Sequence, residues 1–465
     1  MQKKTKIIAT LGPSSDSVAK MIKLVRAGVN VFRINLSHSS QEIIKNYIEK
    51  INVVRNKLKL PVAIMIDTRG PEIRVKQFEN KVVKLKRGQM FSFCDGDFLG
   101  DETKVAITQP ICVKDAKVGG VILANDGRMK FKIVAKKPDE LVCKVLSSGE
   151  LRNNKGLSFK SQHFDFEYLN EPDKNDIKLA LSLGAQYISA SFVNTKDDLI
   201  ALKNFAYEFD KQIKIIAKIE NETGLKNLDE IASNCDGLMV ARGDLGVEAS
   251  FEKLPVYQRK IISAAHKHSI ISIVATEMLE SMITSIRPTR AEISDVAKAV
   301  FDGAGAVMLS GESAMGRDPV ACVRAMSKIL KEAESEFDYH SKFLAMPKTP
   351  KTPSELVIQS AVSASFFLKS KAIVTYTSRA KSALRLSTRY AKVPIIAITE
   401  NPNTYHALSL MCGCVPYLKT EEKTLFESVQ KVCSKFKLAK TGDMVIITTG
   451  STDQISNMLK LETIK

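Results

Sequence analysis

Eight short apolar runs alternate with helical stretches over the first 345 residues, and this alternation constrains the fold more than any other feature of the sequence. Each run is nearly continuous in aliphatic residues, which is typical of parallel strands buried on both faces. Strand followed by helix, repeated eight times, predicts a closed (β/α)8 TIM barrel in an α/β chain rather than an open sheet. The predicted strands are residues 6–11, 29–36, 62–67, 187–192, 215–220, 237–241, 270–276 and 305–310.

Two segments interrupt or follow this alternation. Residues 70–165 contain short β-like runs separated by turn signals such as Asp95-Gly96-Asp97, and they predict an inserted β-barrel-like lid domain. A proline-punctuated linker, Met346 to Pro353, then precedes further strand and helix patterns that end in a last predicted strand at 444–449. We therefore predict a barrel in two parts (1–69 and 166–345), a lid (70–165) and a C-terminal α/β domain for regulation or oligomerisation (346–465).

Composition narrows the class of protein. The net charge is +18, but the lysines are dispersed and form no basic run, so we expect no nucleic-acid partner. No apolar run approaches the roughly 18 residues of a membrane span, and the N-terminus leads directly into a strand, so we expect no membrane association. The eight cysteines lie scattered in apolar context, which is typical of reduced thiols and indicates a cytoplasmic protein.

Lys218 and Glu220 are charged residues inside a predicted strand, residues 215–220, where aliphatic packing is expected. Because they are two residues apart, both side chains project from the same face, about 6 to 7 Å apart. A buried charge without a partner is costly, so the two either neutralise each other in a core or stand at a strand end and bind a charged ligand. This strand alone leaves both interpretations open.

The other predicted strands also end in polar residues, and this favours the binding site. Asp244 follows the next strand, 237–241, so an amine and two acids stand at neighbouring strand ends. In barrels of this kind the chemistry takes place at the carboxyl ends of the strands. One polar ring there, with a lysine and two acids, suggests a divalent cation and an anionic substrate. Its members are Arg33, Asn35, Ser37, Asp67, Thr68, Ser191, Lys218, Glu220, Asp244, Thr276, Ser310 and Glu312.

Several motifs in the same order over the whole barrel resemble the pyruvate kinase family. They are Thr5-Lys-Ile-Ile-Ala-Thr-Leu-Gly-Pro13, Arg33-Ile-Asn-Leu-Ser-His38, Asp67-Thr-Arg-Gly-Pro-Glu-Ile-Arg74, Lys218-Ile-Glu-Asn221, Met239-Val-Ala-Arg-Gly-Asp-Leu-Gly246, Ala275-Thr-Glu-Met-Leu-Glu-Ser281 and Met308-Leu-Ser-Gly-Glu312. The resemblance implies a glycolytic phosphotransferase that moves the phosphoryl group of phosphoenolpyruvate to ADP and then protonates the enolate to pyruvate. It also implies a homotetramer, by analogy with the family.

The resemblance assigns roles to individual residues. Glu220 and Asp244 would hold Mg²⁺ or Mn²⁺, which needs only a couple of protein carboxylates beside substrate oxygens. Lys218 would stabilise the migrating phosphoryl group and the enolate, and Thr276 would stand near the methylene carbon, within a water relay. The implied catalytic residues are Lys218, Thr276 and Arg33; the substrate-binding residues are Arg33, Arg74, Ser191, Lys218, Gly243, Asp244 and Thr276; the nucleotide-binding residues are Pro13, Asn35, His38, Asp126 and Lys155.

A second cation site is implied by Asn35, Ser37, Asp67 and Thr68, which resemble the potassium ligands of the family. Oxygen donors with a single negative charge suit a monovalent ion, although without the resemblance the four would be interpreted as a hydrogen-bonded cluster. Glu72 matches the pattern of potassium-dependent members. We therefore expect turnover that depends on K⁺.

Regulation is the part that the resemblance covers least. In members activated by fructose 1,6-bisphosphate, a Thr/Ser-Gly-x-Ser loop and a later glycine-rich loop bind the phosphates. Here residues 377–382 have Ala380 in place of the glycine, and few glycines follow Gly450. Because alanine resists a positive φ, we predict a weak or absent response to this sugar bisphosphate. Arg379 and Lys381 leave another sugar phosphate or AMP open as effectors.

Two other functions were compatible with parts of the sequence. A metal-dependent enolate lyase or aldolase on the same barrel would use the two acids, but would not need the lid or the cluster at residues 35–68. A non-catalytic binding protein would be expected to lack Lys218, Glu220 or Asp244, and all three are present. An assay for pyruvate from phosphoenolpyruvate and ADP separates these alternatives.

Overall fold

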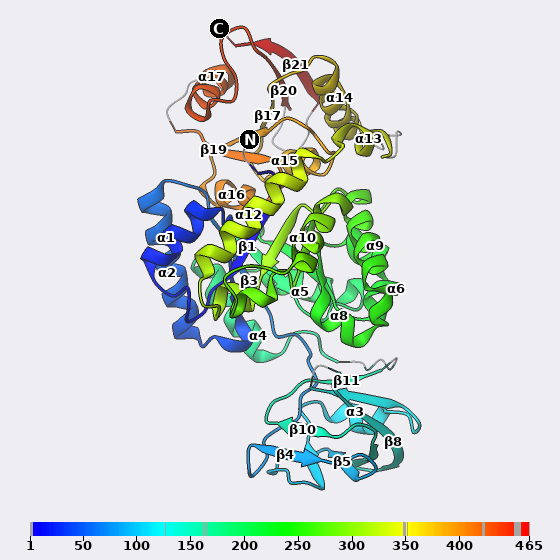
Figure 1. The fold of residues 1–465 in the computed structure, drawn as a ribbon. Helices are drawn as coiled ribbons and strands as arrows, with labels where there is room; N and C mark the ends of the chain where they lie inside the picture. The colour runs from blue at the N-terminus through cyan, green and yellow to red at the C-terminus, as the bar shows by residue number, and fades with distance from the viewer. Residues whose placement is uncertain are drawn as a thin grey trace.

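The structure is a computed structural model that describes residues 3–125, 127–160, 162, 164, 166–346, 350, 352–420, 424–450 and 457–464. Three domains follow one another along the long axis of the molecule (Figure 1). The barrel lies in the middle, the inserted domain lies at one end of it, and the C-terminal domain lies at the other. Within the described residues, no helix combines the length and apolar character that crossing a membrane would require.

The barrel is closed by eight parallel strands in the order β1-β16-β15-β14-β13-β12-β3-β2, which confirms the predicted fold class. Seven of the observed strands lie within their predicted runs, β14 with the same bounds and the others shorter by one to three residues, whereas β13 is shifted by one residue toward the N-terminus. The strands are β1 (Lys6–Thr10), β2 (Val31–Asn35), β3 (Ala63–Asp67), β12 (Tyr187–Ala190), β13 (Lys214–Ile219), β14 (Gly237–Ala241), β15 (Ile271–Ala275) and β16 (Ala306–Leu309). Only β13 begins before its predicted run, by one residue.

The alternation of side chains along β13 explains how a charged pair comes to face the barrel axis. Ile215, Ala217 and Ile219 pack into the core between the strands and the surrounding helices. Ile216 packs on the opposite face, in the interior of the barrel. Since side chains alternate with a period of two, Lys218 and Glu220 continue the inward face of Ile216 toward the carboxyl end of the strand.

Helices surround the barrel, and most of the longer ones begin at a side-chain cap. Ser17, Ser40, Asn170, Thr195 and Thr289 each accept a hydrogen bond from a backbone amide of the first turn. Such caps satisfy amides that have no partner within the helix. The barrel helices are α1 (Val18–Ala27), α2 (Gln41–Leu58), α4 (Glu171–Ser182), α5 (Lys196–Ala206), α6 (Glu222–Lys226), α7 (Leu228–Ser233), α8 (Arg242–Glu248), α9 (Leu254–Lys267), α10 (Arg290–Asp302), α11 (Gly311–Ala314) and α12 (Pro319–Ser335), with 3₁₀ turns η1 (Leu36–His38), η2 (Phe251–Lys253) and η3 (Glu280–Ile283).

The inserted domain is built of short strands, as predicted. Its two sheets have the orders β11-β7-β8-β9-β5-β6 and β10-β4, and they enclose one core that includes Phe91, Phe93 and Phe131. The rings of Phe93 and Phe131 pack edge to face, with centroids 5.1 Å apart. Its elements are β4 (Val82–Leu85), β5 (Met90–Cys94), β6 (Lys104–Ala106), α3 (Pro110–Asp115), β7 (Val121–Ala124), β8 (Met129–Lys137), β9 (Glu140–Val145), β10 (Gly149–Arg152) and β11 (Leu157–Phe159).

The C-terminal domain has a five-stranded sheet in the order β19-β18-β17-β20-β21. The prediction that residues 444–449 form the last strand was wrong, because β21 follows and pairs antiparallel with β20. Both strands that the sequence analysis missed are edge strands: β19 contains Pro416, and β21 is largely exposed. The elements are α13 (Tyr339–Leu344), α14 (Pro353–Phe367), β17 (Ala372–Tyr376), α15 (Lys381–Ser387), β18 (Ile395–Thr399), α16 (Pro402–Ala407), η4 (Leu408–Leu410), β19 (Cys414–Leu418), α17 (Leu425–Phe436), β20 (Met444–Thr449) and β21 (Met458–Thr463).

The C-terminal domain covers the amino-terminal end of the barrel strands. Just before β1, the Lys4 ammonium donates to the carbonyl oxygens of Ala391 at 2.6 Å and Lys392 at 2.5 Å. At the start of β12, the Tyr187 hydroxyl donates to the carbonyl of Ala407 at 2.5 Å. The carboxyl ends of the strands therefore open on the opposite side, toward the lid.

Candidate active site

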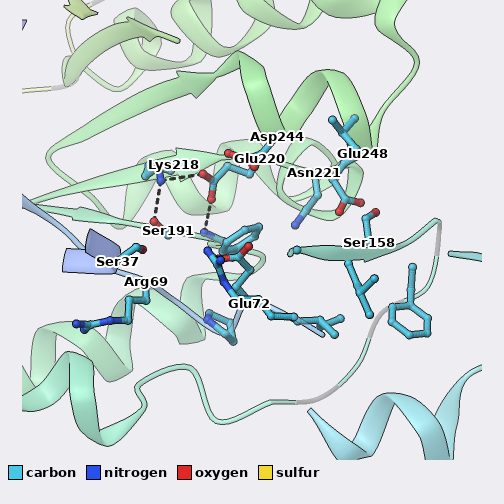
Figure 2. A pocket seen from close by; sticks show the side chains of 18 of the residues that line it. Ser37, Arg69, Glu72, Ser158, Ser191, Lys218, Glu220, Asn221, Asp244 and Glu248 are labelled. Carbon is cyan, nitrogen blue, oxygen red and sulfur yellow. Dashed lines mark hydrogen bonds and ion pairs between the residues drawn. The ribbon is translucent and has the colours of Figure 1, made fainter. Parts of the chain in front are cut away.

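A cavity of about 460 Å³ lies at the carboxyl ends of the barrel strands, between the barrel and the lid. Figure 2 shows side chains of both domains pointing into it. The barrel contributes ten polar residues to the cavity wall, nine of them from the predicted ring and the tenth His38: Arg33, Asn35, Ser37, His38, Asp67, Thr68, Ser191, Lys218, Glu220 and Asp244. The lid side contributes Glu72, Arg74, Lys155 and Ser158. Nine of the twelve residues of the predicted ring thus converge on one cavity, whereas Thr276, Ser310 and Glu312 do not line it.

Lys218 is held by groups from three adjacent strands. Its Nζ lies 2.8 Å from Glu220 Oε1 and 3.2 Å from Asp67 Oδ1, and it donates to Ser191 Oγ at 2.7 Å. Burial alone would lower the pKa of this ammonium, but the attraction of the carboxylates, that of Asp67 foremost, outweighs burial and raises the pKa. Lys218 is therefore a fixed positive charge at neutral pH.

Glu220 is a buried carboxyl group whose two oxygens face different partners. Its side chain is 1% exposed, and Oε2 accepts a hydrogen bond from the backbone amide of Phe192 at 2.5 Å. Oε1 faces Lys218 but accepts no hydrogen bond at a favourable angle. Burial raises the pKa of this carboxyl to about 8, with a contribution from the negative charge of Asp244 and against the opposing effect of Lys218. A cation bound beside this carboxyl would favour its ionised form and lower the raised pKa.

Asp67 links the cations of the site. Its Oδ2 lies 2.5 Å from Arg33 Nε, and its Oδ1 accepts from Ser191 Oγ at 3.1 Å as well as pairing with Lys218. Burial would raise the pKa of this carboxyl, but Arg33 and Lys218 outweigh burial and lower the pKa. Arg33 is oriented further by its hydrogen bond to Thr10 Oγ1 at 3.0 Å. Two positive charges are thus fixed side by side on one carboxylate.

Asp244 lies in the first turn of α8, directly after β14, and its side chain is exposed to the cavity. The preceding amide, of Gly243, donates to Thr276 Oγ1 at 2.8 Å. Gly243 and Thr276 stand beside Asp244 but do not themselves line the cavity. Thr276 has a φ of 67°, a left-handed conformation that is rare for a β-branched residue.

The four predicted potassium ligands share one wall of the cavity. Asn35 and Asp67 are paired residues at the ends of β2 and β3, which brings their side chains to the same level. Asn35 Oδ1 accepts from the backbone amide of Ser37 at 3.1 Å, and the backbone oxygen of Thr68 accepts from Ser191 Oγ at 2.6 Å. The Ser37 side chain is exposed. All four residues offer oxygen atoms, and Asp67, whose two oxygens pair with Arg33 and Lys218, is the single carboxylate among them.

The predicted nucleotide contacts are only partly brought together. His38 and Lys155 line the cavity, and burial, with the charges of Arg74 and Arg33, lowers the pKa of His38. Pro13 is exposed after β1 and does not line the cavity. Asp126 lies outside the described residues.

Lid residues approach the barrel on both sides of the cavity. Arg74 pairs with Glu72 at 2.6 Å and donates to the carbonyl of Asn154 at 2.7 Å, so the guanidinium is oriented within the lid side. On the other side, Gly127 lies against the side chain of Val247, where a Cβ would come within 3.3 Å. Figure 2 shows Glu248 and Ser158 facing each other across the same boundary.

The acidic residues of the cavity are the candidate ligands of a divalent metal ion. Among the described residues, no group of three or more His, Cys, Asp or Glu side chains is arranged to hold a metal ion. Glu220 and Asp244 are two carboxylates facing one cavity, and Glu220 Oε1 is buried without a hydrogen bond. Two carboxylates with room for further oxygen ligands fit Mg²⁺ or Mn²⁺ when the substrate completes the coordination.

Sequence reasoning missed several supporting residues. Thr10 orients Arg33, the Phe192 amide holds Glu220, and the Tyr168 hydroxyl donates to the carbonyl of Ser191 at 2.8 Å. Glu312, a member of the predicted ring, is fully buried and accepts from the backbone amides of Leu279 and Ser310. These contacts join distant parts of the chain and have no local sequence signal.

Comparison with known proteins accounts for nearly the whole chain. A family model described as "Pyruvate kinase, barrel domain" matches residues 2–323, and one described as "Pyruvate kinase, alpha/beta domain" matches residues 355–462.

Individual relatives give the same result. The chain is similar to a pyruvate kinase of Clostridium perfringens, with 37% identity over 99% of this chain and 100% of the relative. It is 38% identical to a pyruvate kinase of Geobacillus stearothermophilus, covering 97% of this chain and 78% of the relative. A crystal structure of a pyruvate kinase from Cryptosporidium parvum superposes with a TM-score of 0.94 at 33% identity, covering 100% of this chain and 97% of the other.

Proposed function

The chain belongs to the pyruvate kinase family, and from this premise we propose that the cavity at the barrel mouth transfers the phosphoryl group of phosphoenolpyruvate to ADP with Mg²⁺ and K⁺. The observation that carries the assignment is the position of Lys218, whose ammonium is buried among Asp67, Ser191 and Glu220 at the carboxyl ends of three adjacent strands. A phosphotransferase site needs such fixed charge, because phosphoryl transfer depends mainly on positioning and electrostatic stabilisation.

Lys218 and Arg33 bind and orient the anionic substrate. Both cations contact Asp67, so neither can rotate away when the cavity fills. Lys218 stabilises charge on the transferring phosphoryl group and on the enolate oxygen that remains. Arg33 and Arg74 attract the phosphate, and Ser191 fixes the ammonium of Lys218 toward it. These groups are oriented before the substrate arrives, which reduces the reorganisation needed in the transition state.

Glu220 and Asp244 would hold the divalent cation. When bound, Mg²⁺ supplies Lewis-acid polarisation of substrate oxygens and neutralises phosphate charge. The chain contributes the fixed geometry: the Phe192 amide holds Glu220, and α8 holds Asp244. The backbone amides around Gly243 and Asp244, at the start of α8, are the proposed site of the substrate carboxylate; the Gly243 amide would first have to release Thr276 Oγ1, to which it donates at 2.8 Å.

Thr276 would act in the second step, the protonation of the enolate at its methylene carbon. Its hydroxyl already accepts from Gly243 N and donates to the carbonyl of Ala275 at 2.6 Å. A hydroxyl that both donates and accepts can orient a water molecule for proton delivery. Its partly buried position limits the competing access of bulk water.

The potassium proposal rests on Asn35, Ser37, Asp67 and Thr68. We expect K⁺ to increase the rate by placing a further positive charge beside the transferring phosphoryl group. The test is activity in a tetraalkylammonium buffer with and without added K⁺. Undiminished turnover without K⁺ would contradict this assignment.

The nucleotide would bind between the barrel mouth and the lid, near His38 and Lys155, with Pro13 and Asp126 as further expected neighbours. Closure of the lid would exclude water and limit hydrolysis of the phosphoryl group. We assign this closing role to the lid, for which we propose the boundaries 70–165. The proposed boundaries of the C-terminal domain are 346–465.

Three broader assignments follow from the family. Glycolysis is the proposed pathway. The cytoplasm is the proposed compartment, since all eight cysteines are free thiols.

A homotetramer is proposed because two separate surfaces expose large apolar side chains. Phe251 and Ile286 on the barrel are 78% and 71% exposed, and Phe367 on the C-terminal domain is 80% exposed. Light scattering on Phe251→Glu and Phe367→Glu variants tests whether each surface forms one interface.

The central experiment is a coupled assay for pyruvate with phosphoenolpyruvate, ADP, Mg²⁺ and K⁺. Lys218→Met removes the buried charge and is expected to lower kcat by at least about 10²-fold, the cost of losing one preorganised stabilising group. Lys178→Met, on the outer helix α4, is the matched control and should retain the wild-type rate. Absence of pyruvate formation by the wild type would refute the proposed function.

A further inference from the structure

The turn that follows β15 contains two consecutive residues in the left-handed region. Thr276 has a φ of 67° and Glu277 a φ of 53°. L-residues rarely adopt this conformation, and a β-branched residue such as threonine is particularly disfavoured there. Such a turn persists only where the surrounding structure holds it, and strained residues of this kind cluster at functional sites.

Arg242 is the side chain that holds this turn. Its Nη2 donates to the carbonyl of Thr276 at 2.7 Å, and its Nε lies 3.3 Å from the carbonyls of both Ala275 and Thr276. The side chain is only 8% exposed. Because a guanidinium is a planar fork, it can bind two adjacent carbonyls at once and fix the peptide planes between them.

Asp295 orients the guanidinium from the other side. Its Oδ2 lies 2.6 Å from Arg242 Nη1, and it projects from α10, the helix that follows this turn. Arg242 does not line the cavity, and its recorded partners are the turn, Asp295 and the sulfur of Met278. It therefore acts on a substrate only through other residues.

We infer that Arg242, oriented by Asp295, is a positioning residue that holds Thr276 in its left-handed conformation against the Gly243 amide, next to Asp244 at the edge of the cavity. This inference rests on the proposed function, in which Thr276 serves the enolate. In this conformation the Thr276 hydroxyl accepts a hydrogen bond from the Gly243 amide at 2.8 Å, so we expect a change in the turn to disturb that contact. Relaxation of the turn moves that hydroxyl away from the methylene carbon that receives the proton.

The first test replaces the fork and keeps the charge. Arg242→Lys retains a cation for Asp295 but binds only as a point charge, so we expect it to behave as a loss of function. A displacement of Thr276 by about 1 Å is expected to lower kcat by about 10- to 100-fold. Mn²⁺ affinity should stay at the wild-type value, because Asp244 and Glu220 are not moved. Arg259→Gln, an exposed arginine on α9, is the matched control.

The second test relieves the strain. Glycine adopts a positive φ without steric cost, so Glu277→Gly makes the left-handed turn easier to maintain. We expect the double variant Arg242→Lys/Glu277→Gly to recover a substantial part of the lost kcat. We also expect Arg242→Lys to slow the exchange of pyruvate methyl protons with D₂O, which is the protonation step in reverse.

The outcomes separate the inference from the function on which it rests. If the wild-type protein forms no pyruvate from phosphoenolpyruvate and ADP, the proposed function fails. If the wild type is active and Arg242→Lys keeps its kcat and exchange rate, the inference fails. A structural role would give a different pattern: Arg242→Lys would lose Mn²⁺ affinity or thermal stability together with kcat, and adding Glu277→Gly would restore none of the lost kcat. That pattern would also refute the inference.

Discussion

Replacement of Glu220 by glutamine is predicted to stabilise the metal-free protein while removing its activity. The Glu220 side chain is 1% exposed, and burial raises its pKa to about 8 from an ordinary value of 4.5. Near pH 7 the folded protein therefore binds a proton at Glu220 that the unfolded chain releases. Glutamine has the shape of the protonated acid and no such proton to bind.

The magnitude follows from proton linkage. A raised carboxyl pKa means that the native state binds more protons than the unfolded state, so stability falls as pH rises from about 4.5 to about 8. Each pH unit corresponds to about 1.36 kcal/mol, so the wild type loses about 3 kcal/mol by pH 7 and about 1 kcal/mol by pH 5. Glu220→Gln removes this loss. Its advantage over the wild type should therefore grow from about 1 to about 3 kcal/mol between these two pH values.

The assay is urea denaturation in EDTA at pH 5, 6, 7 and 8, with the free energy of unfolding compared at each pH. Groups with shifted pKa values that do not interact with Glu220 are present in both proteins and cancel in the difference. Glu208→Gln, at an exposed position, is the isosteric control and should track the wild type. A Glu220→Gln variant that is less stable than the wild type at pH 7, or offset by a constant amount, would refute the reasoning. Either result would mean that Glu220 is ionised and stabilised by Lys218.

Three further predictions use other parts of the molecule. Glu220→Gln and Asp244→Asn should each weaken Mn²⁺ binding by at least about 10-fold in isothermal titration calorimetry, because each removes one of two carboxylates that face the cavity. An unchanged Mn²⁺ affinity in one variant would exclude the replaced residue as a metal ligand. Burial, with a contribution from Arg55, lowers the pKa of His406 to about 3, so the folded state favours the neutral ring. The free energy of unfolding should therefore fall as pH drops below about 6.5, by about 2 kcal/mol at pH 5. His406→Asn should flatten this part of the plot of unfolding free energy against pH, measured in urea, and an unaltered slope would contradict the assignment. The premise of the prediction for fructose 1,6-bisphosphate was wrong, because Ala380 adopts a φ of 64°, the left-handed conformation that alanine was expected to resist. We still expect the half-saturation for phosphoenolpyruvate to change little, because few glycines follow Gly450 in the sequence, although the residues just after it lie outside the described part of the chain; a large decrease in steady-state assays would show that the loop binds the phosphates.

The sequence by itself determined the barrel and the location of its site. Strand and helix alternate with the period of buried parallel strands, and polar residues stand where the apolar runs stop. The two-residue spacing of Lys218 and Glu220 placed both on one face, and the structure has Nζ and Oε1 2.8 Å apart. These features are local, so the pattern of neighbouring residues is enough to predict them. The edge strands β19 and β21 were missed because edge strands tolerate proline and exposure.

Only the tertiary structure decided how the site residues are held. Asp67 joins Arg33 to Lys218, and Arg242 meets Asp295 across 53 residues of chain. The left-handed turn at Thr276 could not be predicted either, since the local preference of threonine opposes it. Contacts between distant residues depend on how the strands close into a barrel, and no short stretch of sequence encodes that closure. The residue types that carry the chemistry can therefore be identified from the sequence, whereas the orientation of their side chains is a property of the folded chain.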